Sequence, residues 1–269
     1  MSAKTIDELN QLQQETWTTG DFPKMGVELS IAGEMLCESV PVLAGDRVLD
    51  VGTASGNTAL SAARRRAIVT GIDITPALLE RARLRAAAEG LSIDFRQGDA
   101  TALEFKDGAF DVVMSTFGSI FAPDPEKTAA EMSRVCRSGG KIAMAVWTPE
   151  GMLGKLFHML ARYSPPAAQV DQPVSWGDEA ILRKRLAPYV KDLRIKREAV
   201  RFRSLSPRHW VEFMKTYFGP AILAFGYSSP DAQGTLTREM EDLMSQYNRS
   251  PNNTTLSESE YLDVVATRI

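Results

Sequence analysis

The stretch VLDVGTASGNTAL, residues 48–60, predicts a buried strand that runs through a turn of small residues into a helix. Glycine and alanine at such a turn permit a positive φ and let ligand atoms come against the backbone, and the helix start presents free N–H groups. Asp73 ends the next expected strand, 23 positions after Asp50, where a carboxylate can accept hydrogen bonds from ribose hydroxyls. Together these features predict a nucleotide-type site over the carboxyl ends of the strands.

Short apolar runs alternate with helical stretches from residue 47 onward, which is typical of repeated βαβ units. A helix is expected from Pro125, with Cys136 on its buried face and Gly139 and Gly140 at its end. Further helices are expected at 152–163, 207–218 and 237–247. The expected strands are 47–51, 68–74, 93–97, 110–115, 141–147, an edge strand at 193–202 and a final strand at 261–269. The pattern predicts an α/β fold with a doubly wound, mostly parallel, seven-stranded sheet.

A single domain is expected for residues 1–269, because a chain of this length lies within the range that α/β folds fill as one unit. Residues 1–45 are expected to form N-terminal helices, and residues 46–147 the cofactor-binding core. Residues 148–269 are expected to form a helical lid together with the last edge strands.

Charge and cysteine usage narrow the class of partner. The formal net charge is −3, so the chain offers no overall attraction to phosphate backbones, and Arg64–Arg66 is interpreted as a solvated helix face. We therefore expect no nucleic-acid partner. Cys37 and Cys136 lie far apart without a neighbouring Cys/His cluster, so they predict reduced, buried thiols and no metal site. A polar N-terminus and the absence of a long apolar run predict a cytoplasmic protein without a membrane span.

A dinucleotide is an alternative ligand for this loop, because the G-x-G-x-x-G fingerprint of dinucleotide sites uses the same strand, turn and helix. Counted from Gly52, that fingerprint requires glycine at positions 54 and 57, where this chain has Ala54 and Asn57. The last glycine of the loop in this chain is instead Gly56. The spacing suits a ligand without a pyrophosphate, whose amino-acid portion lies against the turn, and NAD-dependent redox chemistry is disfavoured.

Five motifs, in this order, resemble those of the class I S-adenosylmethionine-dependent methyltransferases, in the group of the ubiquinone and menaquinone biosynthesis methyltransferases. They are VLDVGTASG at 48–56, GIDITP at 71–76, GDA at 98–100, FDVV at 110–113 and RVCRSGGK at 134–141. The resemblance covers about residues 17–147. It implies S-adenosylmethionine as cofactor, S-adenosylhomocysteine as product, and an inserted, antiparallel last strand.

By this resemblance, Asp50, Gly52 and Gly56 would line the methionine end of the cofactor, and Asp73 would hold its ribose. Ala54 stands where the family usually has its middle glycine, so one additional methyl group lies near the cofactor. Ile74 would pack on the adenine, and Asp99 and Ala100 would meet its amino edge. Ser115 would close the pocket near the sulfonium, and Thr53 is also expected to bind the cofactor.

The acceptor implied is a small, aromatic or quinone-like molecule, methylated on an oxygen or an activated carbon. Its expected contacts are the aromatic residues Trp17, Phe117, Trp147 and Trp210. His209, at the start of a predicted helix, is the candidate general base, with a capping or surface role as the alternative. Two other functions stay open: a non-methylating rearrangement that uses the same cofactor, and a catalytically silent module that senses it. A homodimer also stays open.

Overall fold

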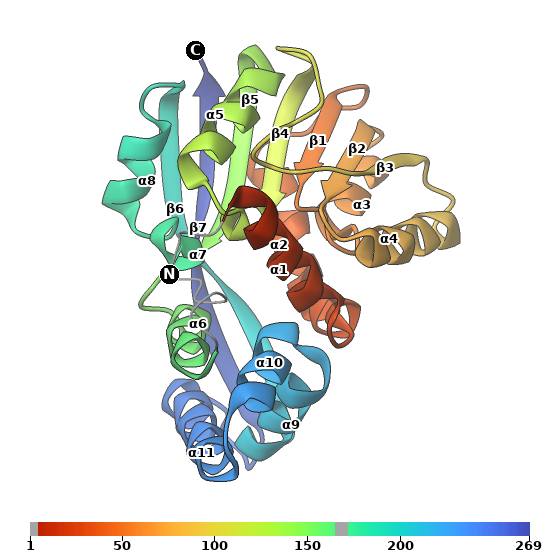
Figure 1. Cartoon of the computed structure of the whole chain (residues 1–269). Coiled ribbons are helices and arrows are strands. Elements are labelled where there is room, and N and C mark those ends of the chain that lie inside the picture. Colours follow the sequence, from red (N-terminus) through yellow and green to blue (C-terminus); the bar gives the residue numbers. More distant parts are fainter. Residues whose placement is uncertain (1–4, 165–171) are drawn as a thin grey trace.

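The computed structural model describes residues 5–164 and 172–269. These residues contain one sheet of seven strands (Figure 1). The strand order is β3-β2-β1-β4-β5-β7-β6. The first five strands are parallel, and β7 is inserted antiparallel between β5 and β6. The doubly wound, mostly parallel sheet is therefore confirmed. Its strands are β1 (Arg47–Val51), β2 (Ile68–Asp73), β3 (Ile93–Gln97), β4 (Phe110–Thr116), β5 (Cys136–Trp147), β6 (Val190–Ser204) and β7 (Thr255–Arg268).

Helices cover both faces of this sheet, because alternate side chains of the buried strands point to opposite sides. Val48, Val112 and Met114 belong to the core shared with α3 (Asn57–Arg64) and α4 (Pro76–Ala88). Leu49, Val51 and Val113 belong to a second core, which includes the apolar side chains of α5 (Pro125–Val135) and α8 (Glu179–Leu186). The two N-terminal helices are α1 (Ile6–Thr18) and α2 (Phe22–Ser39), and α2 contributes to both cores.

Strands β6 and β7 are longer than predicted and pair from Val190↔Arg268 to Ser204↔Thr255. Polar residues alternate along both strands, so the hydrophobic pattern alone did not mark their ends. The chain between them forms α9 (Pro207–Tyr217), α10 (Gly219–Tyr227) and α11 (Pro230–Tyr247). These helices and α6 (Met152–Tyr163) pack together below the sheet in Figure 1, where the parallel strands end. The predicted helix 237–247 begins earlier, at Pro230, and α10 was not predicted.

The junction of α5 and β5 differs from the prediction. The helix ends at Val135, and Cys136 is the first residue of β5, where it pairs with Phe110. The pairing then shifts, so that Val112 faces Lys141. Strand pairing therefore overrides the helical spacing of the sequence, although Cys136 is buried as predicted. Both thiols are free and buried, and burial raises the pKa of each to about 12.

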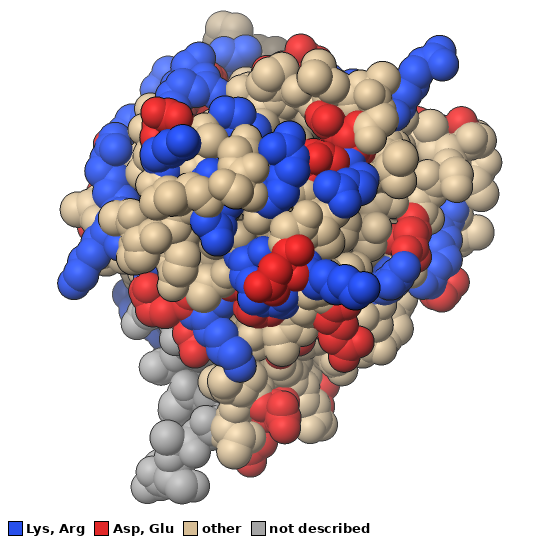
Figure 2. All heavy atoms as spheres, turned by 90° about the horizontal axis from the view of Figure 1, so that it is seen from above, with Lys and Arg blue, Asp and Glu red and all other residues tan. Residues whose placement is uncertain are grey.

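Basic and acidic side chains are interspersed on the face seen from above in Figure 2. Arg64 and Arg65 illustrate the arrangement, since both form ion pairs with Glu34 and Arg64 forms another with Glu89. This part of the predicted arginine run is therefore a paired, partly solvated helix end. Within the described ranges, no helix is both long and apolar enough to cross a membrane.

Candidate functional site

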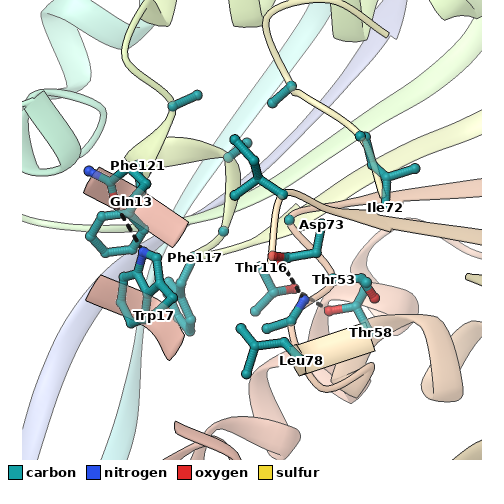
Figure 3. A pocket seen from close by; sticks show the side chains of 18 of the residues that line it. Gln13, Trp17, Thr53, Thr58, Ile72, Asp73, Leu78, Thr116, Phe117 and Phe121 are labelled. Atoms are coloured by element: carbon teal, nitrogen blue, oxygen red, sulfur yellow. Dashed lines mark hydrogen bonds between the residues drawn. The ribbon is translucent and has the colours of Figure 1, made fainter. Parts of the chain in front are cut away.

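A cavity lies where β1, β2 and β4 end and where α1 and α2 come over them. Figure 3 shows its two ends: Thr53 and Asp73 lie together on one side, and Trp17, Phe117 and Phe121 lie on the other. The loops after four parallel strands contribute to its wall, as expected for a site at the carboxyl edge of a doubly wound sheet. The first end is here called the carboxylate end and the second the aromatic end.

The loop after β1 forms the floor of the cavity with backbone in unusual conformations. Gly52, Ala54 and Gly56 all have positive φ, of 69°, 47° and 87°. A Cβ on Gly52 would lie 2.7 Å from the backbone of Gly118, in the loop after β4. The two loops therefore touch through backbone alone, which only glycine allows at this separation. Ala54 adopts the left-handed conformation despite its side chain, which costs the fold free energy.

Asp73 presents its carboxylate to the cavity in a fixed orientation. Its Oδ2 accepts a hydrogen bond from the Ala54 N–H, and its Oδ1 accepts one from the Thr75 N–H, both at 2.8 Å. Burial raises the pKa of Asp73, and these hydrogen bonds oppose that rise because they favour the charged form. Each oxygen keeps a free lone pair, so the carboxylate can still accept two hydrogen bonds from a diol.

Asp50 lies directly behind the floor loop rather than on the cavity wall. Its Oδ2 accepts from the Thr53 hydroxyl at 2.6 Å and from the Ala59 N–H at 3.0 Å. Its Oδ1 is buried without a hydrogen-bond partner. Burial is the main cause that raises the pKa of Asp50 to about 7, and the negative charge of Asp73 adds to it. Asp50 thus orients the loop through Thr53.

Asp99 connects the loop after β3 to the N-terminal helix. Its Oδ2 accepts hydrogen bonds from the Asn10 side-chain amide and from the Thr101 hydroxyl, both at 2.8 Å. Its Oδ1 accepts from the Thr101 N–H at 2.7 Å. Asn10 and Asp99 both line the cavity, so this hydrogen bond holds α1 across one side of it.

The aromatic end is built around Trp17 of α1. Its ring makes edge contacts with Phe22 and Phe121, at centroid separations of 5.1 and 4.8 Å. The indole N–H donates to Oε1 of Gln13 at 3.0 Å, which fixes the ring (Figure 3). Phe117, with a positive φ of 59°, stacks on Trp147 at 3.7 Å. This end therefore offers flat apolar surfaces held in place by a second layer of aromatic packing.

The structure brings most of the predicted site residues together. Asp50, Gly56, Ser115 and Trp147 lie behind the wall: the Gly56 N–H donates to the Thr53 carbonyl, and the Ser115 hydroxyl accepts from the Ser119 N–H. Those that line the cavity are Gly52, Thr53, Ala54, Asp73, Ile74, Asp99, Ala100, Trp17 and Phe117.

Two predicted residues are not at this site. His209 is exposed in the first turn of α9, where its N–H donates to the capping Ser206 hydroxyl and its Nδ1 lies 2.6 Å from the Ser204 hydroxyl. Trp210 is buried in the apolar core that also includes side chains of α6, α10 and α11. Neither lines the cavity, because α9 packs its apolar face against α10 and α11 and turns its histidine toward solvent. The alternative that His209 is a surface residue at a helix cap is the one the structure supports.

Several cavity residues were not predicted. Asn10 and Gln13 lie at helical spacing from Trp17, which was predicted, so the polar and aromatic face of α1 was the signal that could have found them. Thr116, Ser119 and Phe121 follow β4, but the order of residues in that loop does not show which side chains turn inward.

Comparison with known proteins agrees with this geometry. A family model described as a methyltransferase domain matches residues 49–144. An uncharacterized protein of Mycobacterium tuberculosis is 40% identical over 239 residues, which cover 87% of each chain. The demethylmenaquinone methyltransferase of Thermus thermophilus is 38% identical over 117 residues, covering 42% of this chain and 53% of that one. This chain belongs to the S-adenosylmethionine-dependent methyltransferases.

The solved structures show the same fold. The YcgJ protein from Bacillus subtilis has a TM-score of 0.57 at 20% identity, over 88% of this chain and 97% of that one. S-adenosylmethionine is the cofactor of this protein, as of its family. The carboxylate end provides what such a cofactor requires: a diol acceptor in Asp73 and a backbone floor at Gly52 without side chains.

Proposed function

We propose that this methyltransferase transfers a methyl group to an oxygen or an activated carbon of a small aromatic or quinone-like molecule. The observation that carries the proposal is the aromatic end of the cavity, where Trp17, Phe22, Phe117 and Phe121 face the same space as the floor loop. Flat apolar walls favour a flat apolar ligand, since stacking and edge contacts between rings add to the burial of area.

The residues at the carboxylate end would hold the cofactor. Asp73 would accept the ribose hydroxyls, and Ile74 would pack on the adenine. Asp99 and Ala100 would lie at the adenine amino edge, with Asn10 already bonded to Asp99. Gly52, Thr53 and Ala54 would lie under the methionine portion, supported from behind by Asp50, Gly56 and Ser115.

The protein contributes positioning and the exclusion of water rather than a base. When bound, S-adenosylmethionine supplies an electrophilic methyl group, which an acceptor with a free electron pair can take by displacement. Among the described residues of the cavity wall, the carboxylates are Asp73, which lies on the side opposite the aromatic rings (Figure 3), and Asp99, whose two oxygens already accept hydrogen bonds from Asn10 and Thr101. The wall residues therefore align the acceptor, and an acidic phenol or enol loses its proton to water before transfer.

A product assay tests the proposal. The protein is incubated with S-adenosylmethionine and with matched acceptors of similar size: a naphthohydroquinone, a naphthol, a naphthylamine and an aliphatic alcohol. S-adenosylhomocysteine and the methylated product are measured by mass spectrometry. We expect product from the hydroquinone or the naphthol, and product from the alcohol or the amine alone would contradict the proposal.

A matched pair of variants connects that result to the aromatic end. Phe121→Leu removes a ring from the cavity wall, whereas Phe105→Leu removes one that packs on Phe110 outside it. We expect Phe121→Leu to raise the KM for the aromatic acceptor at least about fivefold, in proportion to a lost ring contact of about 1 kcal/mol. Phe105→Leu should leave that KM unchanged.

A further inference from the structure

The hydroxyl of Ser119 is buried at the cavity without a partner. Ser119 is 2% exposed and lines the cavity, and its Oγ makes no hydrogen bond. Other described side chains also carry buried, unpartnered polar atoms, but Ser119 is the one among them that lines this cavity. A buried hydroxyl without a partner is costly, so it signals a ligand atom that would complete it.

The backbone around Ser119 is fully bonded, so the free hydroxyl is held in place. Its N–H donates to the Ser115 hydroxyl at 2.9 Å, and that hydroxyl donates to the Val51 carbonyl at 2.7 Å. The Ser119 carbonyl accepts from the Ala122 N–H at 3.1 Å. The chain of bonds ties the start of η1 (Ser119–Phe121) to the end of β1. Only the side-chain oxygen remains for a ligand.

The position of Ser119 in the fold indicates which ligand it meets. Its backbone nitrogen would lie 3.0 Å from a Cβ on Gly52, so Ser119 adjoins the floor loop. Phe117 and Phe121, two residues to either side, belong to the aromatic end. Ser119 therefore lies at the junction between the floor and the aromatic walls, where an acceptor must place its reacting atom.

Other polar groups near this junction already have partners. The Trp17 indole N–H is bonded to Gln13, and the Thr116 hydroxyl accepts from the Thr58 hydroxyl at 2.7 Å. We infer that the Ser119 hydroxyl donates a hydrogen bond to an oxygen on the acceptor's ring and so selects oxygenated aromatic acceptors over plain ones. Ser119 is a positioning and specificity-determining residue that keeps its own proton. This inference rests on the proposed function.

The test measures binding, so it does not depend on turnover. The protein is saturated with S-adenosylhomocysteine, and the affinities for 2-naphthol and for naphthalene are measured by equilibrium dialysis. The two probes differ by one hydroxyl, so the ratio of their affinities isolates that oxygen. We expect the unmodified protein to prefer 2-naphthol, and Ser119→Ala to reduce that preference by about 3- to 10-fold, as the loss of one buried hydrogen bond implies.

Ser133→Ala is the matched control, because Ser133 is equally buried but donates to the Ala129 carbonyl in α5, outside the cavity wall. It should leave the preference unchanged and lower the thermal stability, whereas Ser119→Ala removes no internal bond and should not lower it. Calorimetry with S-adenosylhomocysteine should give the same affinity for all three proteins.

The outcomes separate this inference from the proposed function. If both probes bind and Ser119→Ala keeps the full preference, the inference is wrong and the aromatic acceptor site stands. If Ser119→Ala weakens the binding of S-adenosylhomocysteine but keeps the preference for 2-naphthol, the Ser119 hydroxyl contacts the cofactor rather than the acceptor, and the inference is also wrong. If the unmodified protein binds S-adenosylhomocysteine but neither probe, the proposed acceptor class fails, and the inference fails with it.

Discussion

Asp73→Asn separates the two tasks that this carboxylate performs. In the structure its two oxygens accept one N–H each, from Ala54 and from Thr75. An asparagine offers one oxygen, so its NH₂ group would face one of these donors and leave it unpaired. That loss costs about 1–3 kcal/mol. Burial raises the pKa of Asp73, so removing its charge returns part of this cost, and we expect a net loss of stability of about 1 kcal/mol.

Binding should suffer more than stability. The ribose diol would lose one of two hydrogen bonds to a charged acceptor, which corresponds to about 1.5–3 kcal/mol and a 10- to 100-fold weaker affinity for S-adenosylhomocysteine. Titration calorimetry measures the affinity, and urea unfolding measures the stability. Asp94→Asn is the control, because Asp94 is an exposed residue of the adjacent strand that pairs with Arg96. Equal affinities for Asp73→Asn and the unmodified protein would refute the role of Asp73.

Three further predictions follow from the same geometry. Ala54→Gly should raise the free energy of unfolding by up to about 1 kcal/mol in urea titrations, because it relieves a left-handed alanine, φ 47°, at some entropic cost; a decrease would contradict this. The pKa of Asp50 is raised to about 7, so its stabilising contribution is present below its unfolded pKa of 3.8 and is lost as the pH rises through 7. This contribution lowers the free energy of unfolding by about 1.4 kcal/mol per pH unit between pH 4 and 7, and Asp50→Asn should remove that decline. An unchanged slope in the variant would contradict the raised pKa of Asp50. His209→Ala should change turnover less than twofold, since His209 is exposed and lies off the cavity wall; a 100-fold loss would restore it as the base.

The core of the fold follows from its sequence because local and tertiary preferences agree there. Residues 47–51 and 93–97 form strands at the predicted bounds, since apolar runs end at small or polar residues that also end the pairing. The site loops after β1, β2 and β3 could be found for the same reason. In a parallel sheet, a residue that follows a strand must lie at the carboxyl edge.

The contacts of α1 and of the helices α9 to α11 could not be predicted to the same depth. His209 and Trp210 lie on a helix that starts where expected and ends one residue earlier than predicted, but the packing of α9 on its neighbours decides which way each side chain points. Asn10 reaches Asp99 across 89 residues of sequence, and Ser119 meets the cavity through a turn fixed by Gly52 and Gly118. Such contacts depend on tertiary packing, which periodicity does not record.

The most direct test of the central claim is titration calorimetry of the unmodified protein with S-adenosylmethionine, S-adenosylhomocysteine and NAD. The cavity has the diol acceptor and the bare floor that the two sulfur ligands need, and its loop lacks the glycine spacing of a dinucleotide site. We predict micromolar binding of both sulfur ligands and no response to NAD. Binding of NAD without either sulfur ligand would contradict the assignment of this cavity.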